Sequence, residues 1–130
     1  MRIAVVIPVL DEAARIGRRL AECAARGFDE IIVADGGSRD ETVAIARARP
    51  DVSVVVASRG RGLQMNAGVR ATHADVLLFL HADVELPQDA RAWIERTLAA
   101  SDVVAGAFRI HTIADVGRNW LGPLLRLADV

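Results

Sequence analysis

Residues 30–42 read EIIVADGGSRDET, and this stretch indicates the fold of the chain. A nearly continuous apolar run ends in Asp35, two glycines follow, and Ser38-Arg39-Asp40-Glu41 has the capping-box pattern that opens a helix. Apolar runs without alternation are typical of strands that are buried on both faces. The stretch therefore predicts a buried strand, a polar turn, and a helix whose first turn is capped by Ser38.

The same combination of apolar run and helical stretch recurs along the chain. Further apolar runs cover residues 3–9, 52–57 and 76–80, and helical periodicity fills the stretches between them. Repeated units of this length require parallel strands joined by right-handed crossovers, with helices on both faces of the sheet. The predicted fold class is α/β, a Rossmann-like, doubly wound and mainly parallel sheet that occupies residues 1–130 as a single domain.

The first helical stretch has an apolar face and an arginine-rich face. The apolar positions, which we expect to pack on the sheet, are Ile16, Leu20, Cys23 and Ala24. The arginines that this arrangement leaves for water are Arg15, Arg18, Arg19 and Arg26.

The second half of the chain predicts three more elements. Pro87 is placed in the first turn of a fourth helix that runs to about Ala100 and carries Trp93 into the core. A fifth strand is expected over residues 103–110, and another helix over residues 117–128.

The composition narrows the class of protein. The chain has 130 residues, of which 52% are hydrophobic and 25% charged, and this excludes an intrinsically disordered protein. The net charge is −1, so no nucleic-acid partner is expected. Every basic residue is arginine, and the lack of lysine excludes Schiff-base chemistry and a P-loop. One cysteine, Cys23, and an N-terminus without the pattern of a signal peptide predict a cytoplasmic protein.

Polar residues follow each of the four apolar runs. The carboxyl ends of parallel strands share one edge of a sheet, where open α/β sheets bind ligands. Carboxylates gathered at such an edge repel one another and any phosphate unless a divalent cation lies among them. The pattern predicts a site for a metal-bridged diphosphate. The polar segments are Asp11-Glu12, Asp35-Gly36-Gly37-Ser38, Ser58-Arg59-Gly60-Arg61-Gly62 and His81-Ala82-Asp83.

These residues suit such a ligand in different ways. Asp83 and His81 supply an oxygen and a nitrogen ligand two positions apart. Arg59 and Arg61 can contact phosphate oxygens, and Gly36 precedes a helix whose backbone N–H groups bind anions.

Each residue also has a simpler structural interpretation, which the sequence leaves open. Asp11 or Glu12 can cap a helix, and Asp35 can be a turn residue. His81 can be an ordinary hydrogen-bonded histidine at the end of a strand, and Arg59 a solvated surface charge.

Four motifs, taken in order, resemble the donor half of glycosyltransferase family 2. The similarity covers nearly the whole chain and is greatest to the bacterial subgroup often labelled radical-SAM/selenodomain-associated transferases. The motifs are IPVLDE at 7–12, EIIVADGGSRDET at 30–42, GRGLQMNAG at 60–68 and LFLHAD at 78–83.

The resemblance implies a GT-A fold, a nucleotide-sugar donor with UDP favoured, and transfer with inversion to an acceptor hydroxyl of unknown identity. It implies that Asp83 holds Mg²⁺ or Mn²⁺ against the diphosphate. His81 stands where the family has an aspartate; imidazole suits Mn²⁺ better than Mg²⁺, so either the metal preference shifts or Asp83 coordinates alone. The residues implied at the nucleotide are Pro8, Asp11, Glu12, Asp35, Gly36, Arg61 and Ala82.

The resemblance also implies a catalytic base from a region beyond residue 130. We therefore expect the chain to be the N-terminal part of a longer enzyme, able to bind the nucleotide but a poor catalyst alone. The apolar positions of residues 117–127 are expected to support a homodimer or a peripheral membrane contact.

The alternative is a non-catalytic Rossmann-like domain. A dinucleotide-binding domain needs G-x-G-x-x-G in its first loop, where residues 8–12 contain no glycine. A receiver-like signalling module needs an aspartate after the third strand and a lysine, and neither is present.

Overall fold

The computed structural model describes residues 1–100 and 102–109. All strand pairs in this part of the chain are parallel, and the sheet order is β3-β2-β1-β4. No helix of the described residues is long and apolar enough to cross a membrane. The elements are β1 Ile3–Val9, α1 Ala13–Ala25, β2 Glu30–Asp35, α2 Thr42–Arg47, β3 Val52–Val56, α3 Arg61–Arg70, β4 Val76–Phe79 and α4 Ala90–Leu98.

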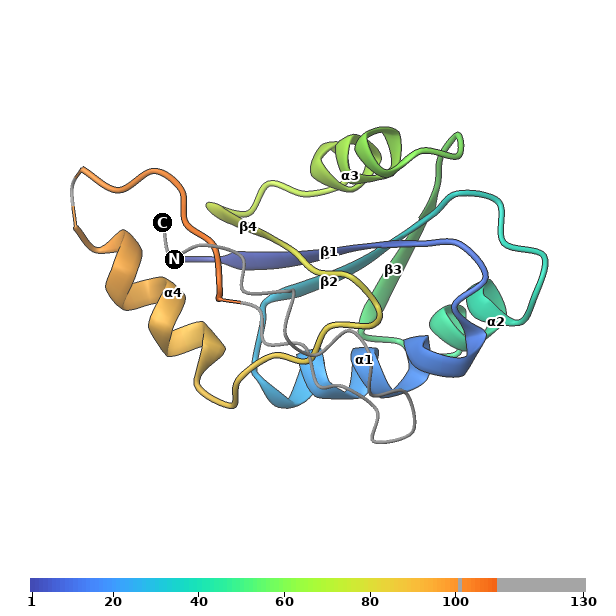
Figure 1. Ribbon diagram of the computed structural model, residues 1–130, viewed down its shortest axis with the longest axis horizontal. Helices are drawn as coiled ribbons and strands as arrows, with labels where there is room; N and C mark the ends of the chain where they lie inside the picture. Colours follow the sequence, from blue (N-terminus) through green and yellow to red (C-terminus); the bar gives the residue numbers. More distant parts are fainter. Residues whose placement is uncertain (101, 110–130) are drawn as a thin grey trace, which may run out of the picture.

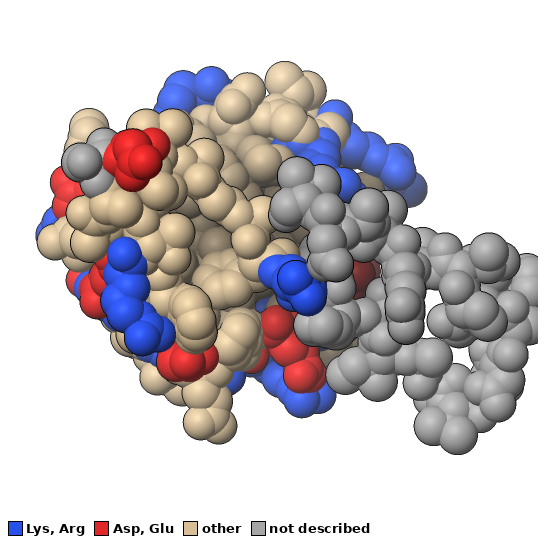
Figure 2. All heavy atoms as spheres, turned by 60° about the vertical axis from the view of Figure 1, so that its left-hand side comes forward, with Lys and Arg blue, Asp and Glu red and all other residues tan. Residues whose placement is uncertain are grey.

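Helices cover both faces of the sheet, which confirms the doubly wound α/β class. Figure 1 shows α3 on one face and α1 with α2 on the other. Each strand is followed by a helix, so the polar segments after the strands lie along one edge of the sheet. On the part of the face left uncovered in Figure 2, several acidic and basic side chains lie side by side.

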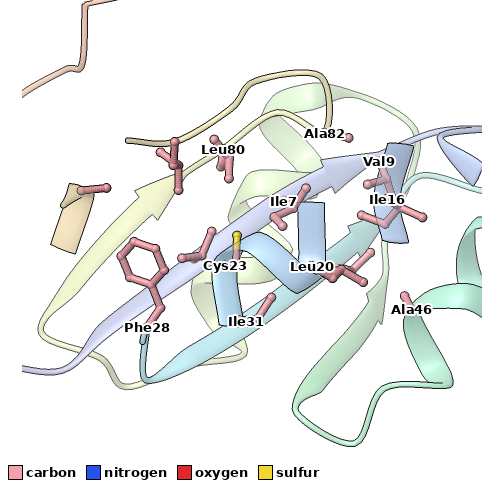
Figure 3. Close-up of a cluster of buried hydrophobic side chains, with 14 of the residues drawn as sticks. Ile7, Val9, Ile16, Leu20, Cys23, Phe28, Ile31, Ala46, Leu80 and Ala82 are labelled. Atoms are coloured by element: carbon pink, nitrogen blue, oxygen red, sulfur yellow. The ribbon is translucent and has the colours of Figure 1, made fainter. Parts of the chain in front are cut away.

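The main core lies between the sheet and α1. Alternate residues of β1 enter it, as the period of a strand requires, and the apolar face of α1 closes it (Figure 3). Its members include Ile3, Val5, Ile7, Val9, Ile16, Leu20, Cys23 and Ile31. The other face of β1 and β2 forms a smaller cluster of Ala4, Val6, Ile32 and Ala34.

The two outer strands are less buried than their apolar sequences predict. Val56 at the end of β3 is 67% exposed and Phe79 at the end of β4 is 41% exposed. The expectation of burial on both faces is confirmed for β1 and β2 and is wrong for β3 and β4. The reason is topological, since β3 and β4 are the edges of the described sheet.

The expected fifth strand is absent from residues 103–109. A strand requires a hydrogen-bonding partner, and no described strand pairs with this segment, in which Val104 is 95% exposed. Residue 110, the helix expected over 117–128 and the contact surface expected at 117–127 lie outside the described residues.

The fourth helix begins later than predicted. Pro87 lies in a turn in which its carbonyl oxygen accepts the N–H of Ala90 at 3.2 Å, and α4 starts only at Ala90. Trp93 was expected in the core and is 50% exposed. Its indole N–H donates to Asp89 at 2.7 Å, and the Arg96 guanidinium lies 4.5 Å from the ring centroid, so polar neighbours hold it at the surface.

Candidate functional site

Two hollows lie at the edge formed by the carboxyl ends of the strands. The first has a volume of about 380 Å³ and the second about 210 Å³. The first is lined by Leu10, Asp11, Gly36, Gly37, Arg39 and Arg59. The second is lined by Ala14, Arg15, Arg18, Arg19, Ala82, Asp83 and Glu85.

Of the seven residues expected at the nucleotide, three line one of the two hollows. Asp11 and Gly36 line the first hollow, and Ala82 lines the second beside Asp83. The remaining four line neither hollow and are Pro8, Glu12, Asp35 and Arg61. The first hollow therefore joins the loops after β1, β2 and β3, and the second joins α1 to the loop after β4.

Asp35 holds its own loop in place. The side chain is buried, with 3% of the residue exposed, and its oxygens accept the N–H groups of Gly37 at 2.9 Å and Ser38 at 3.1 Å. The structure thus confirms a turn-forming role for Asp35. A contact between Asp35 and a base stays a prediction.

Two side chains of the loop after β2 and one from the first residue of α2 cap the start of α1. Ser38 Oγ accepts the N–H of Asp11 at 2.9 Å, Thr42 Oγ1 accepts that of Glu12 at 2.8 Å, and Asp40 Oδ2 accepts that of Ala13 at 3.1 Å. The prediction that Ser38 caps its own helix is wrong. Because α2 begins only at Thr42, the Ser38 hydroxyl bonds to the neighbouring loop instead.

Asp11 completes this connection from the other side. Its Oδ1 accepts the N–H of Arg39 at 2.8 Å, and its backbone has a φ of 52°, a left-handed conformation that aspartate tolerates better than most residues. Glu12 occupies the N-cap position of α1 but makes no capping hydrogen bond with its side chain. Two of the three loops that line the first hollow, those after β1 and β2, are thus held together by reciprocal hydrogen bonds.

The hydrogen bonds at the start of α1 distinguish the chain from dinucleotide-binding domains. In those domains the pyrophosphate accepts hydrogen bonds from the N-terminus of the first helix. Here the N–H groups of Asp11, Glu12 and Ala13 already donate to side chains of the neighbouring loop. The structure therefore disfavours the dinucleotide-binding alternative.

Gln64 is a buried polar residue to which the sequence analysis assigned no role. It is 5% exposed, and its Nε2 donates to the carbonyl oxygens of Val9 at 2.7 Å and Ala34 at 2.9 Å. Its Oε1 accepts the N–H of Gly60 at 3.3 Å. Its position in the GRGLQMNAG motif is the one signal that could have identified it, because helical periodicity does not distinguish it from a surface glutamine.

Two arginine side chains make the first hollow suitable for an anion. Arg39 and Arg59 both line it, and no described residue forms an ion pair with either guanidinium. Arg61, expected at the phosphates by resemblance, is the first residue of α3 and is exposed outside the hollow. Arg39 lies within the motif at 30–42, but its place in the chain does not show that it lines a hollow.

Asp83 offers an uncommitted carboxylate beside the second hollow. It is exposed, and no hydrogen bond or ion pair with another described residue occupies its oxygens, whereas neighbouring Glu85 pairs with Arg18 at 2.9 Å. His81 is half-buried, and its carbonyl oxygen accepts the N–H of Val84 at 3.1 Å in the turn that carries Asp83.

The donor set at this turn suits a divalent cation that shares its ligands with a substrate. Within the described part of the chain, no group of three or more His, Cys, Asp or Glu residues could hold a metal. His81 and Asp83 can therefore supply at most two protein ligands. Mg²⁺ and similar ions are commonly held by one or two carboxylates together with phosphate oxygens and water. The residues present fit such an ion.

Arg19 departs most from its predicted environment. It was expected to face water, but it is 4% exposed, and its Nε donates to the carbonyl oxygen of Ala82 at 3.2 Å. Burial lowers the pKa of its guanidinium, and Glu22 forms an ion pair with it. Helical periodicity failed here because the loop after β4 covers this side of α1.

Comparisons with known proteins agree with the fold and the motifs. The family model described as Glycosyl transferase family 2 matches residues 4–126. Undecaprenyl-phosphate 4-deoxy-4-formamido-L-arabinose transferase from Pseudomonas aeruginosa is 32% identical over 140 residues, which are 97% of this chain and 41% of that protein. The transferase of the same name from Pseudomonas fluorescens is 30% identical, again over 97% of this chain and 41% of the relative. The chain thus spans about two fifths of the length of these relatives.

A solved structure shows the same architecture. Glucosyl-3-phosphoglycerate synthase from Mycobacterium tuberculosis, in complex with Mn²⁺, UDP and glucosyl-3-phosphoglycerate, superimposes with a TM-score of 0.67 at 27% identity. The match covers 78% of this chain and 40% of the synthase. The names of these relatives do not support the narrower radical-SAM-associated subgroup.

Proposed function

The chain belongs to glycosyl transferase family 2, and we propose that it binds a nucleotide-sugar donor, with UDP as the favoured nucleotide, together with a divalent metal. In the proposed reaction the sugar passes with inversion to the hydroxyl of an acceptor that stays unidentified. The proposed compartment is the cytoplasm, because the chain's one cysteine is a buried free thiol.

The observation that carries this proposal is that groups of opposite charge lie along one edge of the sheet. The guanidinium groups of Arg39 and Arg59 line the first hollow and the Asp83 carboxylate lines the second, and none of the three forms an ion pair with a residue that the structure describes. A diphosphate alone would be attracted by the arginines and repelled by Asp83. A diphosphate with a bound cation suits both, since the cation carries the charge that a carboxylate binds.

The metal would be held by Asp83, with His81 as the second candidate ligand. Mn²⁺ is present with UDP in the mycobacterial synthase complex, and imidazole suits Mn²⁺ better than Mg²⁺. When bound, such an ion offsets the negative charge that develops on the diphosphate leaving group.

The chain's own residues supply binding and orientation. Arg39 and Arg59 can donate charge-assisted hydrogen bonds to phosphate oxygens. Asp11 and Gly36 shape the hollow from two loops that hydrogen-bond each other, so the walls are formed before the ligand arrives. The proposed nucleotide contacts of Pro8, Glu12, Asp35, Arg61 and Ala82 rest on the resemblance, and the base that deprotonates the acceptor is still expected beyond residue 130.

Calorimetric titration of the chain with UDP, GDP and NAD, each with Mn²⁺ and again with EDTA, tests the proposal. We expect Mn²⁺ to strengthen the binding of UDP, and we expect Asp83→Asn to abolish this gain while leaving the weaker binding in EDTA. Asp51→Asn is the matched control, because Asp51 precedes β3 at the opposite edge of the sheet and pairs with Arg49. Binding of NAD without metal, or no nucleotide binding by the folded chain, would contradict the proposal.

A further inference from the structure

Two charged residues of α1 and the residue directly after the helix, Arg26, contact the loop between β4 and α4. Arg19 donates through Nε to the carbonyl oxygen of Ala82 at 3.2 Å. Glu22 Oε1 accepts the N–H of Leu86 at 3.0 Å. Arg26 donates through Nη2 to the carbonyl oxygen of Leu86 at 3.1 Å and through Nε to that of Pro87 at 2.9 Å. The loop that carries Asp83 is therefore fastened at both of its ends.

The three side chains also bind one another. Glu22 pairs with Arg19 and, at 3.2 Å, with Arg26. Their side chains are only 5%, 14% and 18% exposed for Arg19, Glu22 and Arg26. Burying charges costs desolvation energy, and a buried ion network is a weak source of stability compared with apolar packing. Its presence under this loop needs a reason other than stability.

The loop itself has no regular structure to hold it. Residues 81–89 contain no helix or strand, so most of their backbone groups lack the partners that a sheet or helix provides. The contacts from Arg19, Glu22 and Arg26 satisfy backbone groups of Ala82, Leu86 and Pro87, on either side of Asp83. Asp83 itself makes no hydrogen bond or ion pair with another described residue, so its place depends on this backbone.

We propose that Arg19, Glu22 and Arg26 are positioning residues that set the place of the Asp83 carboxylate for the metal. This inference rests on the proposed function, in which Asp83 holds the ion. Residues that orient a ligand without touching the metal typically change metal affinity by roughly 10- to 100-fold when they are lost.

Two variants test geometry separately from charge. Arg26→Lys keeps the positive charge but replaces the planar fork, whose Nε and Nη2 donate to Pro87 and Leu86, with a single ammonium nitrogen. Glu22→Gln removes the negative charge of the network and keeps an oxygen that can accept the Leu86 N–H. Glu95→Gln is the matched control, because Glu95 pairs with Arg91 at the same i,i+4 spacing, on α4.

Three measurements are made on each chain: the Mn²⁺ concentration for half-maximal UDP binding, UDP affinity in EDTA, and hydrogen exchange of the Leu86 amide. We expect Arg26→Lys and Glu22→Gln to raise the required Mn²⁺ by about tenfold or more, and Arg26→Lys to speed exchange at Leu86. UDP affinity in EDTA should stay within about twofold, because the first hollow is built by other loops. Glu95→Gln should leave all three unchanged.

The results distinguish the inference from the proposed function. A wild-type chain that shows no Mn²⁺-dependent binding of UDP would overturn both. Normal Mn²⁺ dependence in the wild type that both variants retain, even with faster exchange at Leu86, would overturn the positioning role alone. Equal losses of UDP affinity with Mn²⁺ and with EDTA would also overturn it, since they would indicate general loosening of the fold.

Discussion

Gln64 fits against Gly36 because Gly36 has no side chain: a Cβ atom there would lie 2.7 Å from Oε1 of Gln64. In this position the Gln64 amide bonds to the carbonyl oxygens of Val9, the last residue of β1, and Ala34 in β2. One side chain of α3 thus connects the ends of the two central strands, from which the loops of the first hollow emerge.

Gly36→Ala should destabilise the fold by about 1–3 kcal/mol, because it displaces the buried amide of Gln64 from its hydrogen bonds. The free energy of unfolding in urea measures this. In a Gln64→Ala background the same substitution should cost less, since the atoms that obstruct the new methyl group are gone. Strictly additive effects of the two substitutions would show that Gly36 does not act through Gln64.

Gly68→Ala should cost about 1–3 kcal/mol or more through overpacking. A Cβ at Gly68 would lie 2.3 Å from Cγ1 of Val6, so α3 would have to move away from β1. Gly62→Ala, in the same helix, is the control: nothing lies within 4 Å of its Cβ, and alanine should stabilise the helix by roughly 0.5–1 kcal/mol. Thermal unfolding of both variants tests this difference in stability. Equal shifts in Tm would refute it.

Thr42→Val should lower stability by about 1–2 kcal/mol, because it leaves the N–H of Glu12 without the hydroxyl that caps α1. Thr42 is fully buried, so water cannot replace this hydroxyl. Thr42→Ser retains the oxygen and should keep the Glu12 amide protected from hydrogen exchange. Equal exchange rates at Glu12 in the Val and Ser variants would contradict the capping role.

Arg59→Gln should weaken UDP binding about tenfold or more both with Mn²⁺ and with EDTA, because a guanidinium contact to phosphate does not require the metal. Asp83→Asn should instead affect only the metal-dependent part. Arg70→Gln, at the last residue of α3, serves as the control for loss of one positive charge. An Arg59 effect confined to the Mn²⁺ titration would argue against a direct contact with the phosphates.

The lowered pKa of Asp29 should make the free energy of unfolding depend on pH in the acid range. Its carboxylate accepts the N–H of Ile3 at 2.8 Å and pairs with Arg91 at 3.0 Å, and these contacts lower the pKa of Asp29. A lowered pKa in the folded state gives stability that is complete above the unfolded-state value near 3.9 and is lost as pH falls through the folded value. Asp29→Asn should therefore be less stable than wild type at pH 6, and the difference should shrink below about pH 4. A constant difference across this range in urea unfolding would contradict the linkage.

The parallel direction of the strands could be predicted because it depends on short-range patterns. Apolar runs such as 3–9 became strands, and the polar residues after them lie at one edge because parallel strands end there. The exposure of Val56 and Phe79 could not be predicted, since an apolar run does not show whether its strand is central or at an edge.

The candidate site could be predicted in its residue types more than in its contacts. Asp83 and Arg59 were predicted to bind metal and phosphate, and the structure leaves both side chains without an ion pair among the described residues. Their roles stay predictions. The hydrogen bond from the Asp11 N–H to Ser38 connects residues 27 positions apart. The one from Arg19 to the Ala82 carbonyl oxygen connects residues 63 positions apart. Helical periodicity placed Arg19 in water, and only the loop that covers it shows otherwise.

By itself, the sequence determined the α/β class, the four strands and the edge at which the polar residues gather, because burial of apolar runs and the handedness of crossovers act on any chain with this pattern. The tertiary structure decided which of those polar side chains have partners. Asp35 bonds within its own loop, Ser38 to the loop after β1 and Arg19 to the loop after β4. The side chains of Asp83, Arg39 and Arg59 form no ion pair within the described part of the chain. Hydrogen bonds form between groups brought together by folding, and distance along the chain does not reveal which groups will meet.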